Sequence, residues 1–196
     1  MTLIDTHCHL NFSPLGDDLD GVLARARRAG IDRVIVPAYD AETWQPIADL
    51  AGAHPGTIYP AYGLHPWAAD QDLDRDRLAA LLADPGTVAL GEVGLDARVD
   101  SPPLDTQIPV LTAQLELAHD LGKPVILHCR GAFEELLAVL GRFDPPVRGV
   151  MHAWSRPAEL ALRFVGAGLH LGLGGAVTRR RARLRRAVAE LPLDRV

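Results

Sequence analysis

The sequence predicts an α/β fold, a TIM-type (β/α) barrel with seven of its eight strand-helix units present in the 196 residues. Short apolar runs alternate with longer amphipathic segments, which is typical of parallel strands joined by helices. Histidines and one glutamate follow these apolar runs in strand after strand. A barrel brings the carboxyl ends of its strands to one mouth, whereas an open doubly wound sheet would spread these residues apart. The two observations together favour the barrel.

Seven apolar runs predict the strands, and each is followed by a segment with helical periodicity. The expected strands begin near Leu3, Arg33, Ile58, Val88, Val125, Gly149 and Leu169. The expected helices span residues 19–29, 42–53, 73–83, 107–121, 133–140, 157–166 and 179–191. Helix ends are expected at Gly30, Gly122, Gly141 and Gly166, because glycine suits the left-handed conformation of a helix C-terminus. No Ser-rich or Gly-rich linker divides the chain, so we expect 1–196 to form one domain.

Composition narrows the class of protein before any motif does. The chain has 48% hydrophobic residues and a formal net charge of −5, which excludes a uniformly basic nucleic-acid coat but not a local phosphate-binding patch. Its two cysteines, Cys8 and Cys129, each adjoin a histidine and exclude a disulfide scaffold. No apolar run approaches the ~20 residues of a membrane span, and the first residues lack signal-peptide features. We therefore expect a cytoplasmic protein that makes no membrane contact.

The segment "DTHCHL", residues 5–10, carries two histidines two positions apart. Alternate side chains of an extended strand share a face, so His7 and His9 are expected to face one ion while Cys8 points the opposite way. The alternative for this segment alone is a strand with two histidines that are satisfied by ordinary hydrogen bonds. The rest of the chain has to decide between the two.

Three further candidate ligands follow later strands. Glu92 comes just past the apolar run of the fourth strand, His128 lies on the fifth strand, and His152 lies on the sixth. Each has a structural alternative, such as a solvated strand-end carboxylate or an imidazole bonded to backbone. Their recurrence at equivalent places favours a site for one or two divalent ions, and imidazole ligands favour zinc over calcium.

Six segments of the chain resemble the TatD family of metal-dependent deoxyribonucleases, within the amidohydrolase superfamily. They are "DTHCHL", "GLHPW", "GEVGLD", "PVILHCR", "GVMHAWS" and "LGLGGAVT", and they follow the family's order along the whole chain. The resemblance implies that His7 and His9 hold one metal and that Glu92 bridges two. It implies that His128 and His152 hold the second. It also implies cleavage of DNA with two divalent ions, Mg²⁺, Mn²⁺ or Zn²⁺, by an enzyme that in several members is a 3′ to 5′ exonuclease.

The same chemistry assigns roles to other residues. Two cations joined by a carboxylate lower the pKa of a bound water and neutralise the leaving oxygen, which makes Glu92 a catalytic candidate. His65 in "GLHPW" could bond a phosphate oxygen or assist proton transfer, or could be a loop histidine packed against Trp67. Arg130 could clamp a phosphate or pair with a structural carboxylate. Asp96 could contact substrate, orient a ligand or cap its loop.

The chain departs from the family pattern in places. Ala97 stands where an aromatic residue is usual, Gly131 stands where an acidic one is usual, and "HAW" replaces the common "HCF". The sequence also stops at "LPLDRV", before the Glu-Thr-Asp motif of an eighth strand whose aspartate binds the first metal in the family. We therefore expect a barrel domain that is incomplete at its C-terminus, with exposed edge strands and weak activity.

Three functions are compatible with the sequence. The first is hydrolysis of DNA phosphodiesters, with single-stranded DNA or duplex ends as substrate. The second is hydrolysis of a small amide, lactone or phosphotriester, as elsewhere in the superfamily. There a carboxylated lysine commonly bridges the metals, but Lys123 precedes its strand and Glu92 stands at the bridging position, which favours phosphodiesters. The third is a chain that binds metal or nucleic acid without turnover. The sequence does not predict the oligomeric state.

Overall fold

The computed structural model describes residues 2–98, 102–178 and 184–196, and within them the strands form one parallel seven-stranded sheet. The strands are β1 (Leu3–Asp5), β2 (Ile31–Pro37), β3 (Ile58–Tyr62), β4 (Ala89–Asp96), β5 (Val125–Arg130), β6 (Gly149–Met151) and β7 (Leu169–Leu171). They lie side by side in chain order, and every neighbouring pair is parallel. Such order is that of a (β/α) barrel, whereas a doubly wound sheet reverses its order at a switch point. The predicted fold class is confirmed.

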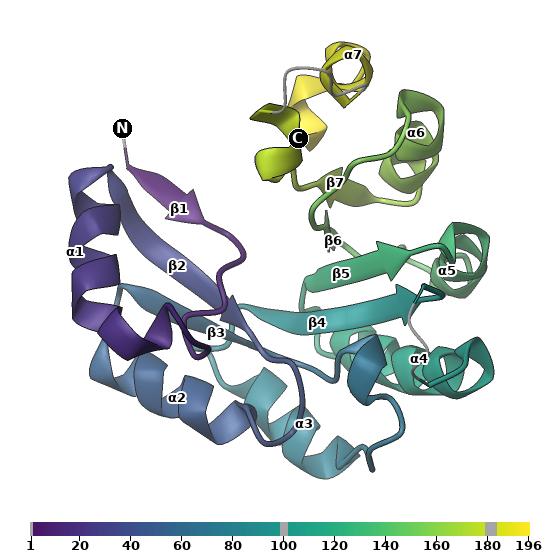
Figure 1. Ribbon diagram of the computed structural model, residues 1–196. Helices are drawn as coiled ribbons and strands as arrows, with labels where there is room; N and C mark the ends of the chain where they lie inside the picture. The colour runs from purple at the N-terminus through teal and green to yellow at the C-terminus, as the bar shows by residue number, and fades with distance from the viewer. Residues whose placement is uncertain (1, 99–101, 179–183) are drawn as a thin grey trace.

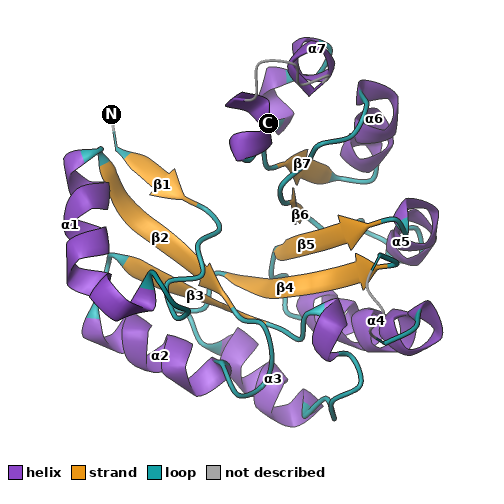
Figure 2. Cartoon of the chain, viewed as in Figure 1, coloured by secondary structure: helices purple, strands orange, loops and turns teal. Residues whose placement is uncertain are grey.

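Helices lie along the outer side of the curled sheet (Figure 1, Figure 2). They are α1 (Leu19–Arg28), α2 (Trp44–Ala53), α3 (Arg75–Ala83), α4 (Leu104–Asp120), α5 (Phe133–Leu140), α6 (Ala158–Gly166) and α7 (Leu184–Ala189). Short 3₁₀ turns are η1 (Gly16–Asp18), η2 (Pro66–Ala68), η3 (Gly175–Thr178) and η4 (Leu193–Arg195). None of the helices in the described ranges is long and apolar enough to cross a membrane.

The glycines of the sequence predicted where several helices end. Gly30 and Gly122 adopt left-handed φ angles of 85° and 63°, as predicted. Gly141 ends α5 in an ordinary right-handed conformation, and the left-handed residue after α6 is Gly168, at φ 97°. Helix α6 nevertheless ends at Gly166, as predicted, and the left-handed conformation comes two residues later. The first part of the expected last helix, residues 179–183, lies outside the described residues.

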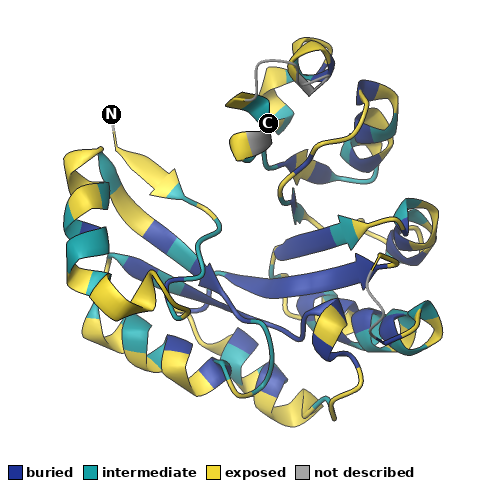
Figure 3. Cartoon of the chain, viewed as in Figure 1, coloured by how far each residue is buried: buried dark blue, intermediate teal, exposed yellow. Residues whose placement is uncertain are grey.

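The hydrophobic core lies between the sheet and its helices, and the central strands are its most buried part (Figure 3). All eight residues of β4 are buried. Burying a large aliphatic or aromatic side chain contributes about 1.5–3 kcal/mol, so the side chains at this interface dominate the stability. Ala61, Ala89 and Ile126 form a smaller cluster that is separate from this core, with Ile35 and Val150 packed against it. The edges of the sheet within the described ranges are β1 and β7.

The pairing of β4 with β5 fixes the place where the candidate site residues meet. In this register Gly94 lies opposite His128, and Asp96 lies opposite Arg130. The φ angle of Gly94 is 151°, and a Cβ atom at this position would collide with the backbone of His128. Glycine therefore permits the close approach of the two strands.

We predict that Gly94→Ala destabilises the fold by about 2 kcal/mol or more, because it adds backbone strain and a clash inside the sheet. Gly52→Ala is the matched control, since Gly52 lies in α2 and a Cβ there meets nothing within 4 Å. The control should stabilise the fold by roughly 0.4–1 kcal/mol. Urea unfolding of both variants measures the difference. Equal stability of Gly94→Ala and the parent chain would contradict the close-approach argument.

Candidate metal centre

The carboxylate of Glu92 lies at the centre of the candidate site. Glu92 occupies the interior of β4 with only 3% of its surface exposed, so it is not the solvated strand-end carboxylate that was one alternative. The expectation that it lies just past the apolar run was wrong, because β4 continues through it to Asp96. A buried carboxylate is costly unless charged or hydrogen-bonding groups surround it.

Two histidines face one oxygen of this carboxylate. Glu92 Oε2 lies 3.2 Å from His7 Nε2 and 3.4 Å from His9 Nε2. Both histidines follow β1, which ends at Asp5, so they lie on a loop. The prediction that they lie on the strand was wrong. The Asp5 carboxylate fixes this loop by accepting the His7 backbone N–H at 3.1 Å. Cys8 packs against the hydrophobic core, so the predicted separation of the two histidines from the thiol is present.

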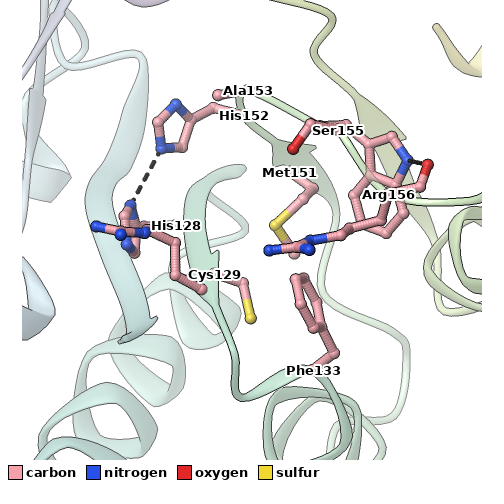
Figure 4. Close-up of a pocket in the computed structure, with 10 residues that line it drawn as sticks. His128, Cys129, Phe133, Met151, His152, Ala153, Ser155 and Arg156 are labelled. Carbon is pink, nitrogen blue, oxygen red and sulfur yellow. Dashed lines mark hydrogen bonds between the residues drawn. The ribbon is translucent and has the colours of Figure 1, made fainter. Parts of the chain in front are cut away.

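Two other histidines face the second oxygen. Glu92 Oε1 lies 2.6 Å from His152 Nε2 and 3.2 Å from His128 Nδ1. His128 projects from β5, and His152 follows directly after β6, facing it (Figure 4). The His7 and His152 rings stack with centroids 4.1 Å apart, which joins the two halves of the cluster. One carboxylate thus separates two pairs of imidazoles.

The donor set fits divalent cations. Ring nitrogens face one another across the centre, with His7 Nε2 3.2 Å from His9 Nε2 and His152 Nε2 3.4 Å from His128 Nδ1. Two imidazole lone pairs at such distances repel unless a proton or a cation lies between them. Imidazole nitrogens with a carboxylate oxygen are ligands that zinc and other divalent transition ions accept.

Proton positions on the rings distinguish a ligand from a hydrogen-bond donor. The ligand atoms of His65, Glu92 and His128 lie within 4.8 Å of one another, as do those of His7, Glu92 and His152. However, Nδ1 of His65 accepts the backbone N–H of Trp67 at 3.2 Å, so the proton of the neutral ring is on Nε2. That Nε2–H lies 3.7 Å from Glu92 Oε1 and suits a donor better than a metal ligand.

The pKa shifts follow from burial and from these contacts. Burial acts to raise the pKa of Glu92, but hydrogen bonds from His128, His152 and His7 outweigh it and hold the pKa well below its usual range. Burial lowers the pKa of His65 to about 4. Burial also lowers the pKa of His7, against the opposing effect of Glu92. At neutral pH the site therefore presents an ionised carboxylate and neutral rings at His7 and His65, whereas Glu92 and Asp96 outweigh burial and raise the pKa of His128. A histidine must be neutral to bind metal.

A second carboxylate orients His128. Asp96 ends β4 with no exposed side-chain surface, and its Oδ2 lies 2.9 Å from His128 Nε2 and 2.9 Å from Trp67 Nε1. In the tautomer whose Nε2–H donates to Asp96, Nδ1 of His128 would be free to bind a cation in place of its hydrogen bond to Glu92. This geometry supports the orienting role considered for Asp96 over direct contact with substrate. Arg130 is half exposed, with its guanidinium 3.5 Å from Asp96 Oδ2.

A scan of the chain against family models matches residues 4–196 to the family described as TatD related DNase. The chain belongs to the TatD family. An uncharacterized metal-dependent hydrolase, YjjV of Escherichia coli (strain K12), is 40% identical over 97% of this chain and 75% of its own length. The 3′-5′ ssDNA/RNA exonuclease TatD of Erwinia billingiae (strain Eb661) is 34% identical over 99% of this chain and 76% of its own length.

Solved structures agree with this assignment. The crystal structure of YjjV, a TatD homolog from Escherichia coli K12, matches with a TM-score of 0.91 at 38% identity. The match covers 98% of this chain and 76% of that one. This TatD-family chain thus spans about three quarters of the length of the relatives named here.

Two buried glutamines support the centre and were not anticipated from the sequence. Gln107 accepts the backbone N–H of Asp96 at 2.8 Å and donates to its carbonyl at 3.0 Å. Gln114 bonds both backbone groups of Leu64, the residue before His65. The two glutamines lie seven positions apart on α4. Their spacing of seven residues puts both glutamines on the same face of α4 as the buried apolar residues. This pattern could have identified them as buried polar residues from the sequence.

Lys123 lies away from the centre. Its Nζ donates to the backbone carbonyls of Asp84 at 3.1 Å and Thr87 at 2.7 Å, before β4 begins. The carboxyl ends of the strands hold the histidine cluster, so Lys123 is at the opposite end of the sheet. It cannot serve as a bridging ligand in this arrangement.

We predict that His7→Ala removes most of the stabilisation that divalent ions give to this protein. An ion at 100 times its dissociation constant stabilises a folded chain by about 2.7 kcal/mol per site, so the Tm of the parent should rise with Mn²⁺ or Zn²⁺. Cys8→Ala is the matched control, because Cys8 adjoins His7 in sequence but packs against the hydrophobic core. It should keep the ion-dependent rise in Tm and the metal content found by elemental analysis. Loss of the metal with Cys8→Ala but not with His7→Ala would overturn the assignment.

Proposed function

We propose that this TatD-family chain is a metal-dependent hydrolase that cleaves DNA phosphodiester bonds by two-ion activation of water. The single observation that carries the proposal is the buried Glu92 carboxylate, which has a different pair of histidines at each oxygen. In this proposal His7, His9 and Glu92 would hold one ion. His128, His152 and Glu92 would hold the other.

A pair of divalent ions joined by one carboxylate supplies a water nucleophile at neutral pH and neutralises negative charge on a phosphoryl group. The side chains set the geometry for this chemistry. Glu92 stays ionised because its hydrogen-bond partners hold its pKa low. Asp96 fixes the tautomer of His128 by accepting its Nε2–H. Strand β4, buried at every residue, keeps both carboxylates in place.

His65 and Arg130 are the proposed contacts to substrate. The neutral His65 ring carries its proton on Nε2, which points at the centre and can donate to a phosphate oxygen. Arg130 has half of its side chain exposed beside the His128 side of the centre, where its guanidinium can bind a phosphate through two N–H groups. In this proposal both side chains bind the substrate and neither is a metal ligand.

Nucleic acid is the proposed substrate because of the family and a named relative. The family description is TatD related DNase, and the Erwinia billingiae relative is named a 3′-5′ ssDNA/RNA exonuclease. Single-stranded DNA and duplex ends are therefore the first substrates to test, with RNA as a comparison. The bridging position holds Glu92, and Lys123 is remote, which disfavours the small amide and lactone substrates considered above.

We predict nucleotide release from single-stranded DNA in the presence of Mg²⁺ or Mn²⁺, and a loss of roughly 10²–10⁴-fold in rate for Glu92→Gln. The control is Glu134→Gln, which removes an exposed carboxylate that pairs with Arg163 on the outer surface. This control should retain the parent rate. End-labelled DNA, RNA and a panel of a phosphotriester, a lactone and an amide are the substrates. Turnover of a small substrate with no metal-dependent cleavage of DNA would refute the proposal.

A further inference from the structure

A small pocket adjoins the metal centre on the side of His128 and His152 (Figure 4). Its volume is about 200 Å³, and its other lining residues include Cys129, Arg130, Phe133 and Arg156. This is below the roughly 300–1,000 Å³ of a pocket that encloses a drug-sized ligand. The pocket is therefore sized for one chemical group of a longer ligand whose neighbouring part lies at Glu92.

The charge of this pocket is positive. Both of its charged lining residues are arginines, and none of the residues that line it is acidic. Arg130 makes its ion pair with Asp96 at 3.5 Å. Arg156 has no ion pair with any carboxylate in the described ranges, and its guanidinium lies over the Phe133 ring, 5.2 Å from the centroid. The charge of Arg156 is thus held in place without being neutralised.

The backbone at Arg156 is fixed by a buried aromatic residue. Trp154 is 2% exposed, packs against Phe133 and Phe164, and donates its Nε1–H to the Arg156 carbonyl at 2.9 Å. From this anchored position the Arg156 side chain extends into the pocket between Met151 and Phe133 (Figure 4). Preorganisation of this kind lowers the entropic cost of binding an anion.

We infer that Cys129, Arg130, Phe133 and Arg156, here named the arginine pocket, bind the phosphate that neighbours the scissile one on a single nucleic-acid strand. The inference rests on the proposed function, because the scissile phosphate is placed at Glu92. A phosphate suits the pocket better than a stacked base, since the Arg156 guanidinium already covers one face of the Phe133 ring. Arg156 is then a specificity residue for substrates that continue beyond the cleaved bond.

The test is equilibrium binding without turnover. A fluorescein-labelled single-stranded DNA hexamer is titrated with the protein in EDTA, and anisotropy reports the dissociation constant. Arg156→Gln should weaken binding by about 10-fold and reduce the slope of log affinity against log salt by about 0.7, the value for one phosphate contact on a single strand. Arg25→Gln is the matched control, because it removes the same charge from α1, where Arg25 pairs with Asp18.

A neutral methylphosphonate, introduced at each linkage of the hexamer in turn, locates the contact. One replaced linkage should weaken binding to the parent chain, and the same replacement should cost Arg156→Gln nothing further. Parent-like affinity of Arg156→Gln, or equal loss in Arg25→Gln, overturns the inference. If Arg156 governs binding in EDTA but no ion supports cleavage, the arginine pocket stands and the proposed function fails.

Discussion

A buried ionised carboxylate is the constraint on which the rest of this structure depends. Glu92 is nearly inaccessible to solvent, yet its pKa lies well below the usual range, so the fold must stabilise a full negative charge in its interior. Removing a carboxylate from water costs several kcal/mol even after the protein relaxes. Imidazoles at both oxygens offset this cost in part, and bound cations would offset it further. In the proposed function, the centre would therefore be stabilised by the same ions that it uses.

The fold meets this requirement by collecting candidate ligands that lie far apart in the sequence. His7 follows β1, Glu92 lies on β4, His128 lies on β5 and His152 follows β6, and sequential parallel order brings these strands side by side. The β4–β5 pair is the critical contact, because Gly94 lets the backbone of β4 approach His128. Helix α4 then fixes the surrounding backbone through its two buried glutamines. A change in strand register would separate the groups that Glu92 needs.

Much of this arrangement could be predicted from the sequence, for a physical reason. Parallel strands of a barrel end at one mouth, so polar residues at the ends of successive apolar runs had to converge, and His7, His9, His128 and His152 do meet at Glu92. The position of Glu92 inside β4 was missed, since its charge interrupts the apolar run that marked the strand. The tautomers of the histidine rings depend on contacts such as that between Asp96 and His128. The spacing of residues in the sequence does not predict such contacts.

The arginine pocket illustrates the other limit of sequence reasoning. Arg156 follows β6 in an exposed loop, and nothing in its neighbours in sequence relates it to Phe133 or Cys129. Only the packing of Trp154 into the core brings these side chains to one place. Residues whose roles depend on loop conformation therefore required the structure, whereas residues tied to strand ends did not.

The claim that Glu92 separates two cation sites is tested most directly by counting the ions and locating them. Crystals grown with Mn²⁺ and measured for anomalous scattering should show two peaks, about 3.5–4 Å apart, with one Glu92 oxygen directed at each. His7 and His9 should contact the first ion, and His128 and His152 the second. A single peak, or two peaks that Glu92 does not bridge, would contradict the account.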